Sequence, residues 1–147
     1  MRWTPRSTVA CVIEHDGRFL CVEEISSGRR VINQPAGHLE EGESLLAAAR
    51  REVLEETGWE VEISALLGLY VYHAANGATY HRYCFVANAV AHHPERPLDD
   101  GIIAAHWLSR DELIGRREPL RSTMVLACID DYLAGRRFPL DFIREEA

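Results

Sequence analysis

Apolar and polar positions follow two different periods along the chain. Runs of β-branched and apolar residues bounded by turn residues predict strands, and these runs cover residues 7–15, 18–25, 60–72, 79–91 and 102–108. Asp16-Gly17 separates the first two runs, which predicts a tight β-hairpin. Residues 31–38 read as a short extended piece followed by a loop, because Pro35 and Gly37 interrupt the run.

The helical period is clearest over residues 43–57. Leu46, Ala49 and Val53 recur at the spacing of one helix face, so a helix with one buried stripe is expected. Gly42 suits the N-cap of this helix and Gly58 the position just after its end. A short helix after Ser109 and a last helix over 120–134 complete the pattern.

The predicted order is strands, helix, strands, helices. This order lacks the regular alternation of a doubly wound sheet, so the predicted class is α+β, with a mixed β-sheet between helices. The 147 residues suit a single domain spanning 1–147.

Composition excludes several function classes. The chain is 47% hydrophobic and 27% charged, which argues against disorder and disulfide-rich scaffolds. A net charge of −7 makes it a poor binder of long nucleic acids. All 16 basic residues are arginine, so chemistry that needs a lysine is excluded.

Targeting and cysteine signals favour a cytoplasmic protein with no membrane partner. The chain has no apolar run of membrane-spanning length, and its first residues do not read as a signal peptide. The four cysteines form no C-x-x-C pair and sit mostly in apolar runs, so buried reduced thiols are expected and a zinc site is not.

Three glutamates of the predicted helix point to metal chemistry. At 100° per residue, Glu52, Glu55 and Glu56 fall within an arc of about 100° on one face. Like charges at this spacing destabilise a helix slightly, so stability alone does not explain them. Clustered carboxylates suit hard cations such as Mg²⁺. A solvated acidic face is the simpler alternative for the helix taken alone.

The surrounding spacing weighs against that alternative. Gly37 is followed at fixed intervals by Glu43, by Arg51-Glu52 and by Glu55-Glu56, and the stretch ends at Gly58-Trp59. This stretch resembles the signature box of the Nudix hydrolases, with Trp59 where the family usually has an aliphatic residue. Three further segments are similar to the phosphatase NudJ subfamily: RWTP at residues 2–5, NQPAGHLE at 33–40 and the run at 107–113.

The resemblance implies an α/β/α sandwich in which the box forms a loop–helix–loop catalytic motif. It implies Mg²⁺ (or Mn²⁺) held by Glu52, Glu56, Glu55 and the backbone carbonyl of Ala36. It also implies that Arg51 and Glu43 pair to fix the helix carboxylates. Asp99 and Asp100 are candidates for one more ligand, and the choice of general base stays open.

The substrate side is less sharply marked. A small phosphorylated substrate is the expected partner, and monomer and homodimer both remain open. An aromatic side chain can stack on a ring and an arginine can hold phosphate, although each is more often packing or a solvated charge. Gln34 and His38 flank the box, and a loop-bracing role for His38 is equally open. The candidate substrate contacts are Trp3, Arg6, Gln34, His38, Tyr80 and Arg82.

The resemblance implies metal-dependent hydrolysis of phosphoanhydride bonds in nucleoside tri- and diphosphates and related small pyrophosphates, including that of hydroxymethylpyrimidine. Water would attack phosphorus, so no Ser-His-Asp nucleophile is needed. The first alternative is a hydrolase specific for one nucleotide or nucleotide sugar. The second is a non-hydrolytic binding or isomerase domain of the same fold.

Overall fold

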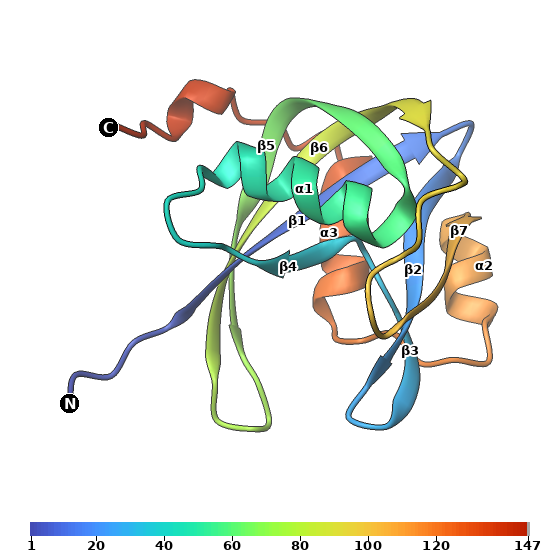
Figure 1. The fold of residues 1–147 in the computed structure, drawn as a ribbon, viewed down its shortest axis with the longest axis horizontal. Helices are drawn as coiled ribbons and strands as arrows, with labels where there is room; N and C mark the ends of the chain where they lie inside the picture. The colour runs from blue at the N-terminus through green and yellow to red at the C-terminus, as the bar shows by residue number, and fades with distance from the viewer. Residues whose placement is uncertain (147) are drawn as a thin grey trace.

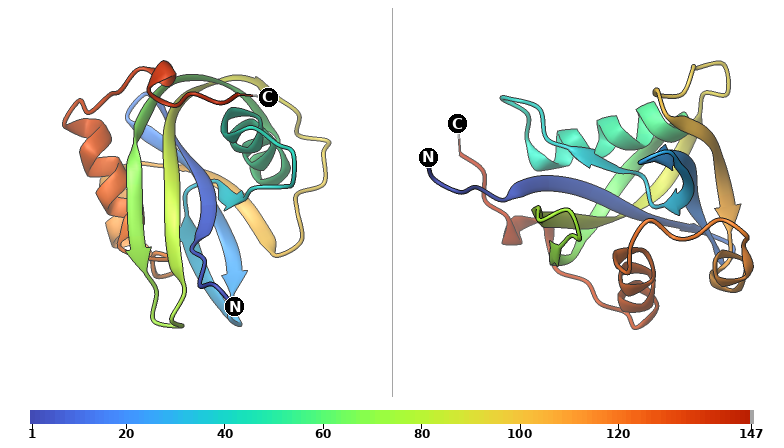
Figure 2. Two further views of the ribbon diagram at one scale, coloured as in Figure 1. Left: turned by 90° about the vertical axis from the view of Figure 1, so that its left-hand side faces the viewer. Right: turned by 90° about the horizontal axis from the view of Figure 1, so that it is seen from below.

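A seven-stranded mixed sheet lies between helices in the computed structural model, which describes residues 1–146. Helix α1 covers one face of the sheet, and α2 and α3 lie on the other (Figures 1 and 2). The elements in chain order are β1 Arg6–His15, β2 Arg18–Ser26, β3 Arg29–Asn33, β4 Ala36–His38, α1 Leu45–Thr57, β5 Trp59–His73, β6 Thr79–His92, β7 Ile102–Leu108, α2 Arg110–Gly115, α3 Met124–Leu133 and the 3₁₀ turn Leu140–Phe142.

The strand order β3-β2-β1-β6-β5 puts β1 in the centre, with β4 pairing β1 and β7 pairing β2. Strands β1 and β6 are parallel, and the other pairs are antiparallel. The predicted α+β class with a mixed sheet between helices is therefore confirmed. The hairpin at Asp16-Gly17 is confirmed as well, because both residues have positive φ, at 49° and 79°.

The two faces of the sheet bury separate apolar clusters. Val9, Cys11 and Phe85 pack toward α1, whereas Ala10, Val12 and Cys84 pack toward α3. Successive strand residues point to opposite faces, so the uninterrupted apolar run of β1 fills both clusters. All four cysteines are free and buried, as expected.

Three predicted boundaries were wrong. Helix α1 begins at Leu45 rather than at Glu43, because the N-cap is Ser44, whose hydroxyl accepts from the Ala47 N–H at 3.1 Å. Gly58 ends the helix with φ 75°, as predicted. The last helix begins at Met124 rather than at residue 120, because Leu120 instead forms a bridge to Ile32 of β3. Residues 31–38, predicted to be a short extended piece followed by a loop, instead hold the end of β3 and the whole of β4, separated by Gln34-Pro35.

Candidate active site

Helix α1 turns two of the three glutamates inward, beside strand β4. Glu52 and Glu56 are only 8% and 7% exposed, and Glu55 is half-buried. Ala48, Ala49 and Val53 bury the adjoining face of the helix against the sheet. The same packing that anchors the helix therefore holds Glu52 and Glu56 away from bulk water.

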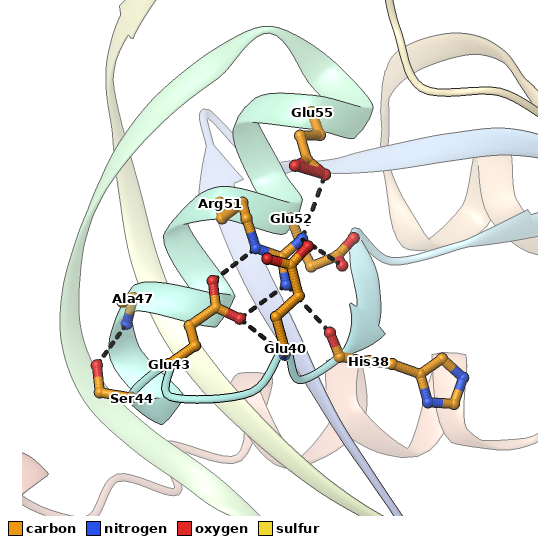
Figure 3. A network of polar contacts seen from close by, with 8 residues as sticks. All are labelled: His38, Glu40, Glu43, Ser44, Ala47, Arg51, Glu52 and Glu55. Carbon is orange, nitrogen blue, oxygen red and sulfur yellow. Dashed lines mark hydrogen bonds and ion pairs between the residues drawn. The ribbon is translucent and has the colours of Figure 1, made fainter.

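Arg51 fixes the carboxylates around it (Figure 3). Its guanidinium donates to both oxygens of Glu43, at 2.6 Å through Nε and 2.9 Å through Nη2. Nη1 donates to Glu52 at 2.9 Å and to Glu55 at 3.2 Å. Nη2 also donates to the backbone carbonyl of His38 at 3.1 Å. Arg51 thereby ties the loop before the helix to the carboxylates on the helix.

Strand β4 meets the helix with no side chain between them at Gly37. A Cβ added at Gly37 would fall on the carboxylate of Glu52, so only glycine leaves that carboxylate its place. One residue earlier, the Ala36 N–H donates to Oε1 of Glu56 at 2.9 Å. These two contacts place the Ala36–Gly37 backbone directly against the two buried glutamates.

The site gathers more negative charge than its arginine balances. Burial raises the pKa of Glu56 to about 9, and the nearby charges of Glu52, Glu24 and Asp99 add to this effect. Burial also raises the pKa of Glu52. By contrast, the hydrogen bond from Arg51 lowers the pKa of Glu43.

A divalent cation suits this donor set. Within residues 1–146, no three His, Cys, Asp or Glu side chains are arranged as a ready metal site, and the side chains of Glu52 and Glu55 both accept from Arg51. The available donors are nevertheless hard oxygens. The negative charges of Glu52, Glu24 and Asp99 near buried Glu56 favour binding of a cation or a proton there. The residues therefore fit Mg²⁺ or Mn²⁺.

Two of the predicted substrate contacts lie in the interior instead. Gln34 is 1% exposed, and its amide is occupied at both ends, donating to the Val125 carbonyl at 2.8 Å and accepting from Arg82 at 2.7 Å. Arg82 is itself only 8% exposed. This placement does not fit direct contact with a substrate. Both residues brace the segment before the box against α3.

The other four candidates lie together near the start of β1. The His38 ring lies 6.3 Å from the Tyr80 ring, and the Arg6 guanidinium lies 6.0 Å from the same ring. The side chain of His38 points away from the Arg51 network (Figure 3). Beside this group is an open depression of about 290 Å³, lined by Trp3, Arg6 and residues 76–79 among others.

Sequence reasoning missed the residues that other elements bring to the site. Glu24 of β2 is buried, accepts hydrogen bonds from Asn33 and Arg121, and lies close enough to Glu56 to act on its charge. The only sequence signal for Glu24 was an acidic pair closing an apolar strand. Asp99, considered from sequence as an additional ligand, lies near Glu56, and its N–H donates to the Glu55 carbonyl at 2.9 Å.

Comparison with known proteins identifies this arrangement of box, helix and sheet. The family model described as the NUDIX domain matches residues 3–127. The chain belongs to the NUDIX family. This NUDIX chain is 37% identical to the phosphatase NudJ of Escherichia coli strain K12, over 95% of its own length and 90% of the relative. The same identity and coverage hold for the phosphatase NudJ of Shigella sonnei.

Solved structures agree with this NUDIX assignment. A NUDIX hydrolase from Nitrosomonas europaea superposes with a TM-score of 0.94 at 47% identity, covering 97% of this chain and 98% of that one. A UDP-X diphosphatase, at 19% identity and a TM-score of 0.75 over 95% of this chain and 68% of that one, shares the fold.

The predicted family, fold and enzyme class are thereby confirmed. This NUDIX chain is a hydrolase that acts on anhydride bonds of phosphorus compounds, and hydrolases of its family generally use divalent metal ions. Their substrates are small phosphorylated molecules. Across residues 1–146, no helix has the length and apolar character needed to cross a membrane.

Proposed function

We propose that this NUDIX hydrolase cleaves phosphoanhydride bonds in nucleoside tri- and diphosphates and in related small pyrophosphates, including hydroxymethylpyrimidine pyrophosphate, with Mg²⁺ as its cofactor. The observation that carries the proposal is the meeting of Glu52 and Glu56 with the Ala36–Gly37 backbone. The NudJ relatives are named phosphatases, which supports orthophosphate as the product.

The proposed metal ligands are Glu52, Glu55, Glu56 and the backbone carbonyl of Ala36. When bound there, Mg²⁺ would neutralise phosphate charge and lower the pKa of a bound water. Glu56 is oriented by the Ala36 N–H, and Glu52 by Arg51. A carboxylate of this cluster would take the proton from the attacking water. Arg51 acts through the carboxylates it orients, since its donors are already engaged.

On the substrate side, the proposed contacts are Trp3, Arg6, His38 and Tyr80. A ring stacked on Tyr80 or His38 would be held by its π face, and Arg6 would add a positive charge beside it. Stacking tolerates different bases, whereas strict choice between bases needs dedicated hydrogen bonds. We therefore expect broad specificity, with kcat/KM values within about two orders of magnitude across nucleotides.

The test is a panel of nucleoside di- and triphosphates, nucleotide sugars and hydroxymethylpyrimidine pyrophosphate, incubated with and without Mg²⁺. Orthophosphate and pyrophosphate are assayed separately. Orthophosphate release from several nucleotides, lost in EDTA, is the expected result. Pyrophosphate as the main product from triphosphates, or one substrate ahead of the rest by about 10³-fold or more, would contradict the assigned specificity. Binding without any hydrolysis would contradict the proposed reaction itself.

A further inference from the structure

An ion pair joins Arg121 to Glu24, whose carboxylate lies close enough to Glu56 to act on its charge. Arg121 lies in the loop before α3, where its N–H donates to the Ile32 carbonyl at 2.8 Å. Its side-chain Nη1 donates to Oε1 of Glu24 at 2.7 Å. Glu24 in turn lies near enough to Glu56 for its charge to help raise the pKa of Glu56.

The Glu24 side of this ion pair is buried and held by a second hydrogen bond. The Glu24 side chain is 10% exposed and also accepts from Nδ2 of Asn33 at 3.3 Å. Asn33 is the last residue of β3, three positions before Ala36. Its Oδ1 is buried and has no hydrogen-bond donor within residues 1–146, which leaves an acceptor free for a bound water or ligand.

The neighbouring pair on β2 and β3 provides a comparison. Arg30 donates to Glu23 at 3.2 Å, and its side chain is 62% exposed. Glu23 and Glu24 are successive residues of β2, so their side chains point to opposite faces of the sheet. The ion pairs that they form with Arg30 and Arg121 therefore begin on opposite faces. Leu20 of β2 packs in the apolar cluster beneath α1 and Cys21 in the one beneath α3, so alternation puts Glu24 on the α1 face and Glu23 on the α3 face.

Arg121 and Arg51 differ in how many of their guanidinium nitrogens are already hydrogen-bonded. Arg51 has all its nitrogens engaged by Glu43, Glu52, Glu55 and the His38 carbonyl. Arg121 is 45% exposed in its side chain. Among the residues that the structure describes, Glu24 is its one side-chain partner. Its Nε and Nη2 groups therefore remain available, and a guanidinium fork matches the geometry of phosphate oxygens.

We infer that Arg121 binds a phosphate group of the substrate and that Glu24 is the positioning residue that holds its guanidinium at the mouth of the site. This inference rests on the proposed function, since it requires a substrate phosphate beside Glu52 and Glu56. In this arrangement Glu52 and Glu56 orient the reacting phosphate from the side of α1. Arg121 holds the rest of the phosphate chain from the side of β2 and β3.

The test compares Arg121→Ala with the matched control Arg30→Ala. Wild-type hydrolysis of a nucleoside triphosphate is measured first, because its absence would refute the proposed function rather than this inference. With an active wild type, Arg121→Ala is expected to lower kcat/KM about 10- to 100-fold, as for loss of a charge-assisted hydrogen bond. Its half-saturating Mg²⁺ concentration should stay within about threefold of wild type, because metal ligands are unaffected. Arg30→Ala should retain wild-type kinetics.

Equilibrium binding gives a second readout. A non-hydrolysable triphosphate analogue, titrated by calorimetry, should bind Arg121→Ala about 10- to 100-fold more weakly than wild type. Arg121→Lys keeps the positive charge but loses the guanidinium fork, and Glu24→Gln keeps the side-chain shape but loses the charge. These two variants carry the test if Arg121→Ala does not fold. Both should raise KM for the triphosphate more than they lower kcat. Wild-type analogue affinity in folded Arg121 variants, or an equal loss in Arg30→Ala, would overturn the inference.

Discussion

Replacing Gly37 by alanine tests whether the close contact between β4 and Glu52 is needed for catalysis. Gly37 has no positive φ, so the change adds no backbone strain, and its whole effect comes from the added methyl group. That methyl would lie well inside the 3.0 Å limit that real Cβ atoms respect, against the Glu52 carboxylate. Either Glu52 leaves its 2.9 Å bond to Arg51, or β4 moves away from α1 and loosens the bond between Ala36 and Glu56.

Both responses displace a proposed metal ligand, so activity should fall whichever occurs. A misplacement of about 1 Å at a reacting centre costs on the order of 10²-fold in rate, and we expect at least that loss in kcat/KM. If the backbone moves, overpacking costs about 1–3 kcal/mol in the free energy of unfolding. For a chain of this size, Tm would then fall by roughly 2–10 °C. If only the Glu52 side chain turns, Tm should change little.

Steady-state hydrolysis at saturating Mg²⁺ and thermal unfolding by circular dichroism measure the two effects. Gly115→Ala is the matched control, because a Cβ at Gly115 meets nothing within 4 Å and Gly115 has no positive φ. We expect wild-type kinetics and Tm for that control. A Gly37→Ala enzyme with kcat/KM within about threefold of wild type would refute the reasoning from this contact.

Three further predictions concern the charged groups. Glu56→Gln keeps the side-chain shape but loses a charged ligand, so kcat at saturating Mg²⁺ should fall at least about 10²-fold; a loss of only a few-fold would contradict its role. Arg51→Ala frees Glu43 and the helix carboxylates, and Mg²⁺ titration of the rate should show binding about 10- to 100-fold weaker; an unchanged Mg²⁺ dependence argues against this role. Because the pKa of Glu56 is raised from 4.5 to about 9 by folding, the free energy of unfolding in EDTA should fall as pH rises between these values. Urea denaturation at pH 5 and pH 8 measures this fall in the free energy of unfolding, and the fall should be smaller in Glu56→Gln. An equal fall in the two proteins would exclude Glu56 as its source.

Much of helix α1 could be predicted because its information is local. The spacing of Glu52, Glu55 and Glu56 fixes their common face, and Gly58 marks the end of the helix. The start was misplaced because Glu43, a good first-turn residue by its charge, is used instead to hold Arg51. The serine that follows it supplies the cap.

The rest of the site depends on contacts distant in sequence. Glu24 and Arg121 lie 97 positions apart in the chain, and the bridge between β3 and the loop before α3 brings them together. Gln34 was assigned to the substrate because it flanks the box, and Arg82 because an arginine can hold phosphate. Both residues are interior and hydrogen-bonded to each other, and a contact between positions so distant in the chain leaves no periodic signal in the sequence.

The parallel pairing of β1 with β6 also has a consequence for how the chain folds. The register runs from Arg6 opposite Tyr80 to Ile13 opposite Ala87, so each contact closes a loop of more than 70 residues. Closing such a loop costs about 4 kcal/mol of chain entropy, whereas the β1–β2 and β5–β6 hairpins close locally. The hairpins should therefore form first, and β1 must wait for β6. Until then its apolar run Val9–Ile13 stays unpaired on one edge, so changes that slow the β5–β6 hairpin should promote aggregation during refolding before they reduce the stability of the native enzyme.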